Sequence, residues 1–255
     1  MDSGRKENWL AKSRQRKKEV DLRHLIYKSI LKFGYEVRRL HYPEWKNARA
    51  YWESGYLKRL GFQPRTVVDV GAAYGTPPIY EAFPESFLVL IEPLREYEPY
   101  IAEILKKYKG KYFLTALGAR DEKRLINIEP RYLEQSSFYH RRPLELTGDS
   151  LSQREISVTT LDGLMEKHNF QPPFGLKIDT EGSEAEVIEG ASDFLKETIF
   201  AILEVTVADR FEGGYSFAEL IALMSKRGFS VCDILDIGRA ENSEVTFMDL
   251  VFKRT

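Results

Sequence analysis

From Thr66 onward, short runs of apolar and β-branched residues alternate with segments of helical periodicity. The apolar runs have the length of buried strands, and the segments between them are long enough for crossover helices. Strands that alternate with helices predict an α/β domain with a doubly wound, mostly parallel sheet and helices on both faces. Because such a sheet binds its ligand outside the carboxyl ends of the strands, functional residues are expected at the strand ends.

The predicted elements follow this alternation along the chain. Strands are expected at 66–70, 86–93, 111–118, 174–179, 198–207, 229–237 and 245–254, and helices at 97–108, 161–168, 183–195 and 216–228. The short link between the last two strands predicts an antiparallel pair at one edge of the sheet. Two further strands, 124–130 and 154–160, flank a long loop, and long loops inside compact domains are often functional.

The first quarter of the chain differs from the rest. Residues 7–33 and 44–60 have apolar positions at helical spacing, so we predict a helical, basic extension at 1–63 and a main domain at 64–255. Residues 1–60 hold 16 Lys and Arg against 7 Asp and Glu, and the remainder holds 22 against 32. A solvated helical face explains the basic arm, and weak contact with an anionic partner or a membrane surface is the alternative.

The composition narrows the class of protein. Hydrophobic residues make up 43% and charged residues 30% of the 255 residues, which is typical of a globular protein. No apolar run approaches the ~20 residues that span a bilayer, and the N-terminus lacks the apolar core of a secretory signal. The single cysteine, Cys232, excludes an internal disulfide and lies in an apolar run, so we expect it in the core of a cytoplasmic protein.

A glycine turn follows the first predicted strand. In "VVDVGAAYG", Asp69 precedes Gly71 and Gly75, and the next strand ends in Glu92. Glycines here let a ligand approach the backbone, and the acid can accept both hydroxyls of a ribose. A dinucleotide site would carry G-x-G-x-x-G, whereas this chain has D-x-G-x-x-x-G, which favours S-adenosylmethionine over NAD.

Six segments, taken in order along residues 64–253, resemble those of FkbM-type methyltransferases, a family of class I S-adenosylmethionine-dependent enzymes. They are "VVDVGAAYG", "IEP", "ALG", "VTTLDGL", "LKIDTEGSEAEVIEGA" and "AILEV". The resemblance implies a seven-stranded, Rossmann-like sheet of doubly wound type with a reversed last strand. It also implies O-methylation of a hydroxyl on a sugar or a sugar-containing natural product, with S-adenosylmethionine as the cofactor.

The resemblance also implies which residues bind the cofactor. The glycine turn would shape the pocket for its methionine end, Glu92 would hold the ribose, and the segment after the third strand would border the adenine. Ala73 is a departure, because many family members have Asn there. The full implied set is Asp69, Gly71, Ala72, Ala73, Gly75, Glu92, Pro93, Leu117, Gly118, Ala119 and Asp179.

Ionisable residues crowd the end of the fourth main strand. Methyl transfer to a hydroxyl needs alignment of the reacting atoms and a base that takes the hydroxyl proton. We expect Asp179 to accept or orient that proton, with Lys177 paired to Asp179 or Glu204. Glu181 is expected at the acceptor's other hydroxyls. For all four residues, an ion-pair network that closes the sheet edge is the structural alternative.

A histidine base is the competing interpretation. His140 lies in "SSFYHRR" (136–142), whose hydroxyls could bind a polyhydroxylated acceptor and whose arginines could bind a phosphate-bearing one. A surface histidine is the plainer interpretation. Glu184 is expected to support the start of a helix. No compact set of ligands demands a metal, so none is expected.

Two other functions stay open on the sequence: an NAD-type oxidoreductase on a related sheet, and a non-catalytic binding module of the same fold. The expected partner is a small-molecule or glycan acceptor. Nucleic acid is not expected, because the chain has KIDT (177–180) where amino-group methylases carry an NPPY-like tetrapeptide.

Overall fold

The computed structural model describes residues 52–130, 132–142, 152–240 and 242–255, all within one compact unit, Trp45–Thr255. The helix predicted at 7–33 and the first half of the one predicted at 44–60 lie outside the described residues. The described part of the second forms α2 (Ser54–Arg59). The predicted domain boundary after residue 63 stays a prediction.

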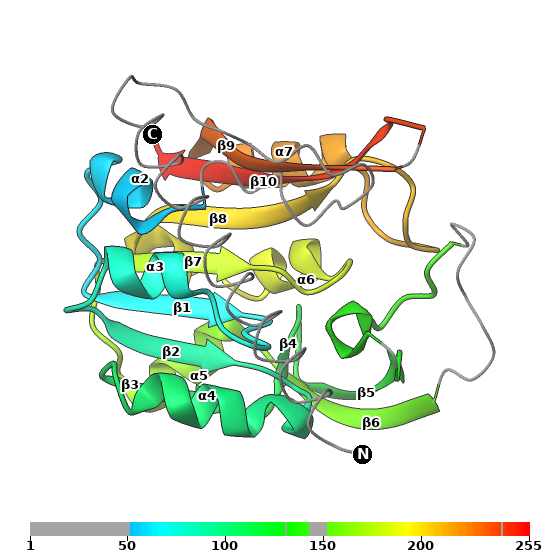
Figure 1. Ribbon diagram of the computed structural model, residues 1–255, viewed down its shortest axis with the longest axis horizontal. Helices are drawn as coiled ribbons and strands as arrows, with labels where there is room; N and C mark the ends of the chain where they lie inside the picture. Colours follow the sequence, from blue (N-terminus) through cyan, green and yellow to red (C-terminus); the bar gives the residue numbers. More distant parts are fainter. Residues whose placement is uncertain (1–51, 131, 143–151, 241) are drawn as a thin grey trace, which may run out of the picture. The chain divides into compact units, whose positions relative to one another are not determined.

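The main sheet has seven strands in the order β3-β2-β1-β7-β8-β10-β9 (Figure 1). They are β1 (Thr66–Val70), β2 (Phe87–Ile91), β3 (Gly110–Phe113), β7 (Phe174–Ile178), β8 (Thr198–Thr206), β9 (Phe229–Arg239) and β10 (Val245–Arg254). The pairs from β3 to β8 are parallel, and β10 is antiparallel to β8 and β9. The predicted doubly wound sheet with a reversed last strand is confirmed. Strand order reverses at the β1–β7 pair, where such sheets bind ligands.

Helices cover both faces of this sheet, as predicted. Besides α2 they are α3 (Pro77–Ala82), α4 (Glu98–Leu105), α5 (Leu161–His168), α6 (Glu184–Glu189) and α7 (Phe217–Lys226), with short 3₁₀ turns η2 (Arg95–Tyr97), η3 (Leu133–Gln135) and η4 (Phe194–Glu197). Local signals set some of the ends. Ser216 and Glu219 form a reciprocal capping box at the start of α7, and the Thr160 side chain accepts a hydrogen bond from Gly163 N at the start of α5.

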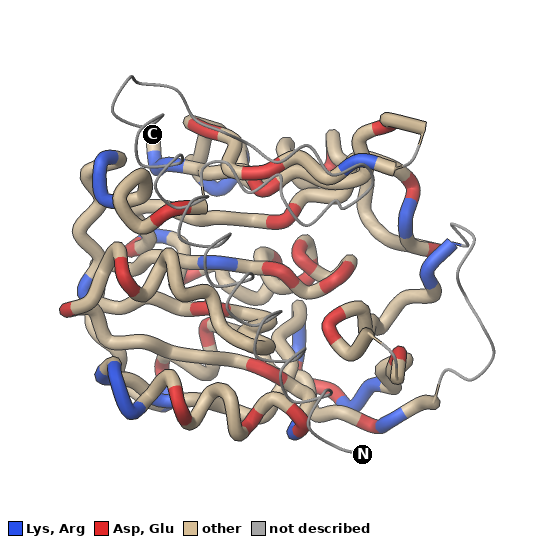
Figure 2. The backbone as a smooth tube through the Cα atoms, in the orientation of Figure 1, with Lys and Arg blue, Asp and Glu red and all other residues tan. Residues whose placement is uncertain are grey.

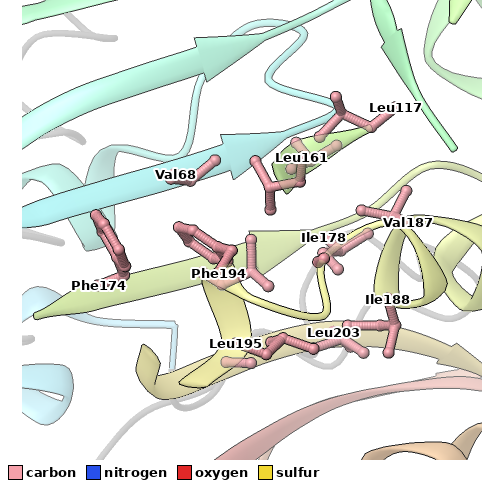
Figure 3. Packing of buried hydrophobic residues seen from close by; sticks show 14 of the residues in the cluster. Val68, Leu117, Leu161, Phe174, Ile178, Val187, Ile188, Phe194, Leu195 and Leu203 are labelled. Atoms are coloured by element: carbon pink, nitrogen blue, oxygen red, sulfur yellow. The ribbon is translucent and has the colours of Figure 1, made fainter. Parts of the chain in front are cut away.

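The core divides into two layers, one on each face of the sheet. On one face, α5, α6, η4 and α7 pack against alternate residues of the strands, including Val68, Ile178 and Leu203 (Figure 3). On the other face, α2, α3 and α4 pack against Leu88 and the residues that alternate with the first set. Strand β1 is buried along its whole length, because a central parallel strand has helices above and below it.

A second, three-stranded sheet lies beyond the third strand. It consists of β4 (Ala116–Leu117), β6 (Ser152–Thr159) and β5 (Glu122–Ile128), in that order. The prediction of one strand over 111–118 is therefore wrong, because the segment leaves the main sheet after Phe113 and enters the small one as β4. The strands predicted around the long loop are confirmed as the antiparallel pair β5 and β6.

Two other expectations need correction. The helix predicted over 183–195 is shorter, because α6 ends at Glu189, before Gly190, and a separate 3₁₀ turn, η4, follows. Cys232 is exposed rather than buried, because its strand β9 forms the edge of the sheet. Among the described helices, none is both long and apolar enough to cross a membrane.

Candidate active site

The glycine turn lies between the ends of β1, β2 and β7. Gly71 N donates to the Ile91 carbonyl at 2.9 Å, and Asp179 N donates to the Val70 carbonyl at 3.1 Å. Gly71 has φ of 73°, and a Cβ atom there would lie 1.8 Å from the Asp179 carbonyl oxygen. Only glycine allows both this left-handed backbone and so close an approach of the two chain segments.

Glu92 follows β2 and is almost completely buried. Its carboxylate accepts hydrogen bonds from Ala73 N at 3.0 Å and from Leu94 N at 2.9 Å, so the glycine turn and the acid are in direct contact. Burial raises the pKa of Glu92 to about 7, although the two backbone N–H groups and Lys177 oppose that shift. Pro93, next along the chain, is partly exposed.

Ala73 has φ of 41°, in the left-handed region. Asparagine adopts this region more readily than alanine, which gives a backbone reason for the residue that the family resemblance leads one to expect here. Ala72 is buried. Gly75 has φ of 90°, and a Cβ atom there would lie 2.4 Å from the Ile104 side chain, so this glycine lets α4 pack closely against the turn.

Asp69 and Lys177 form a buried ion pair. They are neighbours in register on β1 and β7, and Lys177 Nζ lies 3.2 Å from Asp69 Oδ1. The other Asp69 oxygen accepts hydrogen bonds from Thr76 Oγ1 at 2.9 Å and from the Tyr80 hydroxyl. Asp69 is 0% exposed, so its contact with the glycine turn is made from inside the protein, through the hydrogen bond from Thr76.

Lys177 connects that pair to the exposed end of the site. Its ammonium group donates to the Gly71 carbonyl at 3.0 Å and lies 3.5 Å from Asp179 Oδ2. Burial lowers the pKa of Lys177, but Asp69 and Asp179 outweigh it and raise the pKa well above the usual value. Of the two expected partners, Lys177 pairs with Asp179 and not with Glu204; the sequence did not indicate its pairing with Asp69.

Glu184 holds the turn that carries the catalytic candidates. Its side chain, 1% exposed, accepts from Thr180 N at 2.9 Å, from Gly182 N at 3.2 Å and from the Tyr215 hydroxyl at 2.7 Å. Glu184 therefore supports the start of the helix, as expected, by accepting hydrogen bonds from the backbone of the preceding turn. Within that turn Glu181 has φ of 56°, and the Asp179 side chain remains 39% exposed. Figure 2 shows acidic residues gathered where the chain runs from β7 into α6.

Three carboxylates meet above this turn. Oxygens of Asp179, Glu181 and Glu204 all lie within 4.8 Å of one another. Arg210 donates to Glu204 at 2.7 Å and to Glu181 at 3.0 Å, and Arg141 lies 2.5 Å from Glu181. A divalent cation could bind three such carboxylates, but two of them already pair with arginines. Burial, then Asp179 and Glu181, raise the pKa of Glu204.

Asp249 extends this acidic group across the sheet. It is the register partner of Glu204 on β10, and it accepts a hydrogen bond from Trp52 Nε1 at 2.6 Å. Burial and the nearby Asp179 raise the pKa of Asp249 to about 7. The sequence showed no signal that would place Asp249 here, since it reads as one more polar residue in an alternating strand.

The loop after β5 closes one side of the group. Ser137 Oγ donates to the Glu181 carbonyl at 2.6 Å, and backbone bonds join His140 and Arg142 to residues 210–212. His140 itself is exposed and is not part of the carboxylate group. The expected phosphate ligands are engaged within the protein, because Arg142 lies 3.2 Å from Asp209 and Arg141 binds Glu181.

The segment expected to border the adenine has two environments. Leu117 is a core residue of β4, and Gly118 packs so closely on Gly190 that a Cβ atom at Gly190 would lie 2.1 Å from its carbonyl oxygen. Ala119 lines an open pocket of about 460 Å³. The other walls of that pocket are charged: Arg120, Glu122, Arg124, Glu186 and Glu189.

Most of the candidate residues therefore gather in one place, and the sequence missed several that hold them. Asp69, Gly71, Glu92, Lys177 and Asp179 meet where β1, β2 and β7 end. Missed were the residues that reach the site from elsewhere in the chain: Thr76, Tyr80, Arg210, Tyr215 and Asp249. No local sequence pattern marks these residues, because each one is an isolated polar residue in its own segment of the chain.

Residues 69–231 match the model of a family described as the methyltransferase FkbM domain. This match favours the methyltransferase interpretation over the NAD-type oxidoreductase. None of the curated proteins matches the chain.

Three solved structures illustrate the similarity to known proteins. Magnesium protoporphyrin IX methyltransferase from Synechocystis PCC 6803, with bound SAM, has a TM-score of 0.45 and 11% identity, covering 79% of this chain and 76% of that one. A 1,6-didemethyltoxoflavin-N1-methyltransferase from Burkholderia thailandensis has a TM-score of 0.43 and 12% identity, covering 94% and 90%. Aeropyrum pernix fibrillarin, in complex with S-adenosyl-L-methionine, has a TM-score of 0.43 and 11% identity, and the match covers 82% of this chain and 76% of that one.

Proposed function

The chain belongs to the FkbM methyltransferase domain family, and we propose on this basis that it transfers a methyl group from S-adenosylmethionine to a hydroxyl oxygen of a sugar or a sugar-containing natural product. The observation that carries the proposal is the family match over residues 69–231, which spans the chain from the glycine turn to β9. A cytoplasmic location stays a prediction from the composition.

The end of β1 and β2 fits a bound S-adenosylmethionine. Gly71 lets the turn after β1 pack directly against the end of β7, and Glu92 presents a buried carboxylate in contact with the same turn through Ala73 N. Glu92 would hold the ribose hydroxyls, and the glycine turn would hold the methionine end. S-adenosylmethionine supplies an electrophilic methyl group when it is bound.

Asp179 is the proposed base. It is the most exposed member of the carboxylate group, with 39% of its side chain accessible, so an acceptor hydroxyl can reach it. In this proposal Asp179 takes the proton from that hydroxyl, and the oxygen becomes nucleophilic. Lys177 holds Asp179 at 3.5 Å and the Gly71 carbonyl at 3.0 Å, so one ammonium group connects the base to the donor-binding turn.

A polyhydroxylated acceptor suits the surroundings of Asp179. Glu181, Glu204, Arg141 and Arg210 offer both acceptors and donors of hydrogen bonds beside it, and sugar hydroxyls use both. Since both arginines already pair with carboxylates, the acceptor we favour is a neutral sugar; a phosphate-bearing one would have to displace those pairs.

The proposal is tested with purified protein and methyl-labelled S-adenosylmethionine. The acceptor panel contains free sugars, nucleotide sugars, glycolipids and RNA. We expect label in a sugar methyl ether that survives mild alkali, which would hydrolyse a methyl ester. Label that appears only in RNA or in a nitrogen-linked methyl group would contradict the proposed acceptor class.

Two variants separate the donor site from the base. Glu92→Ala should abolish measurable donor binding, whereas Asp179→Asn should bind the donor normally and lose turnover by about 10²–10⁴-fold. Asp193→Asn is the matched control, because Asp193 is an exposed aspartate paired with Lys196 outside the site. Near-normal turnover by Asp179→Asn would remove the assignment of the base while leaving the donor site intact.

A further inference from the structure

Tyr74 carries an aromatic ring at the surface of the glycine turn. The residue lies between Ala73 and Gly75 and is 54% exposed, so a large part of its side chain has free surface. The ring packs edge-on against Tyr97, with centroids 4.9 Å apart, and against Tyr100, with centroids 4.8 Å apart. Two such contacts fix the orientation of the ring but do not enclose it. The turn therefore presents an aromatic surface that the proposed function has not used.

The hydrogen bonds of the turn place Tyr74 beside the proposed ribose site. The preceding residue, Ala73, donates its N–H to Glu92 Oε2 at 3.0 Å. Leu94 N donates to the other Glu92 oxygen at 2.9 Å, and η2 begins directly after Leu94. The Tyr74 ring packs on η2 and α4, which connect β2 to β3. Asp179, by contrast, follows β7, which lies on the other side of β1 in the sheet.

The covalent structure of S-adenosylmethionine gives this arrangement a use. Its ribose carries the sulfur-bearing chain on C5′ and the adenine on C1′, so the methionine end and the base lie on different sides of a bound ribose. In the proposed site Glu92 holds the ribose, and the glycine turn next to Asp179 holds the methionine end. The adenine then points away from β7, toward the β2–β3 connection on which Tyr74 packs.

The residues that the family resemblance assigns to the adenine offer it little apolar surface. Leu117 is a buried core residue of β4, and Gly118 packs closely against Val158 and Gly190. Ala119 faces an open pocket whose other walls are charged side chains. An aromatic ring is the better partner for a planar base, because every base has a π face that can stack on it.

We propose that the adenine of the bound methyl donor stacks on the ring of Tyr74. This inference rests on the proposed function, because it takes the ribose at Glu92 as its starting point. It assigns the binding to the ring of Tyr74 and not to its hydroxyl, and it moves the adenine from the segment after the third strand to the glycine turn itself.

The test is isothermal calorimetry with S-adenosylhomocysteine as the probe. Tyr74→Ala should bind about 5- to 100-fold more weakly than the wild type, which is the range for the loss of one base–aromatic stack. Tyr74→Phe keeps the ring and should bind within about 2-fold of the wild type. Phe87→Ala is the matched control, because Phe87 is 36% exposed, packs against another aromatic ring and lies at the opposite end of β2 from Glu92. It should bind as the wild type does.

Two ligands that contain only part of the probe locate the contact. S-ribosylhomocysteine lacks the adenine, so Tyr74→Ala and the wild type should bind it equally in competition with methyl-labelled S-adenosylmethionine. The ligand 5′-methylthioadenosine keeps the adenine and the ribose, and Tyr74→Ala should lose the same factor for it as for the full probe. Because Tyr74 is more than half exposed, the variant should fold as the wild type does, which circular dichroism checks.

Three results would each overturn the inference and leave the proposed function standing. They are equal binding of the full probe by Tyr74→Ala and the wild type, the same loss for Tyr74→Phe as for Tyr74→Ala, and an equal loss for S-ribosylhomocysteine. Failure of the wild type to bind S-adenosylhomocysteine would overturn both the inference and the proposed function.

Discussion

Replacing Glu184 by alanine should loosen the turn that carries Asp179 without touching the proposed donor site. The carboxylate of Glu184 is the shared acceptor for Thr180 N, Gly182 N and the Tyr215 hydroxyl, at distances of 2.7 to 3.2 Å. Among the described residues, no other acceptor binds both amides of this turn, so the Glu184 side chain ties the start of α6 to the residues before it.

The size of the effect follows from the number of donors left without a partner. A buried donor that loses its acceptor costs about 1–3 kcal/mol, and four donors lose theirs here, because Thr180 Oγ1 also donates to Glu184 at 3.0 Å. Because water can enter the space that the side chain leaves, we expect a total loss of about 3–5 kcal/mol in the free energy of unfolding. For a domain of this size that corresponds to a fall of roughly 6–20 °C in melting temperature.

The assay is equilibrium unfolding in urea, followed by tryptophan fluorescence, for a graded set of variants. Glu184→Gln keeps one carbonyl oxygen for the two amides and should lose only about 1–2 kcal/mol. Glu189→Ala is the matched control, because Glu189 is an exposed glutamate on the same helix. It should change the stability by less than about 0.5 kcal/mol. Donor binding, measured alongside, should survive in every folded variant.

A loss smaller than about 1 kcal/mol for Glu184→Ala would refute this reasoning, because it would mean that the turn keeps its amides satisfied without the carboxylate. Equal losses for Glu184→Ala and Glu184→Gln would refute it in another way. They would assign the effect to the buried charge of Glu184 rather than to the hydrogen bonds that it accepts.

Three further predictions concern the donor side. Gly71→Ala should destabilise the fold by more than about 2 kcal/mol, because its Cβ would lie 1.8 Å from the Asp179 carbonyl oxygen in a left-handed backbone. Urea unfolding measures this loss, and an unchanged free energy of unfolding would contradict the prediction. Lys177→Met should cost about 3–5 kcal/mol by leaving Asp69 buried and charged, and adding Asp69→Asn should restore part of that loss in the same assay. Glu92 has a folded pKa raised from 4.5 to about 7, so its contribution to stability is present below about pH 4.5 and is lost as the pH rises through about 7. Compared with Glu92→Gln, wild type should therefore lose up to about 3 kcal/mol across that interval in thermal unfolding at a series of pH values, and parallel curves would contradict the shift.

The sequence supported the class of fold well, because its evidence is local. The alternation of apolar runs and helical segments, the glycines of the β1 turn and the reversed final pair all depend on neighbours along the chain. The predictions of strand bounds and burial were wrong where tertiary packing overrode the local sequence pattern. The run ending at Gly118 reads as one strand, yet it divides between two sheets, and Cys232 reads as a core residue although its strand is an edge.

The candidate site was predicted in part for the same reason. Glu92, Lys177 and Asp179 stand at strand ends, and topology alone brings strand ends together. Arg210 gave no such signal, because it lies in an irregular segment after β8 and reaches Glu181 and Glu204 only through the path of that loop.

By itself, then, the sequence determined which strand ends would carry the acids and that glycine must follow β1, because periodicity and backbone freedom are properties of short segments. Only the tertiary structure decided how those charges are shared. Lys177 pairs with Asp69 as well as Asp179, and Arg210 rather than Lys177 neutralises Glu204. The physical reason is that the free energy of a buried charge depends on every group within a few ångströms, and those groups come from distant parts of the chain.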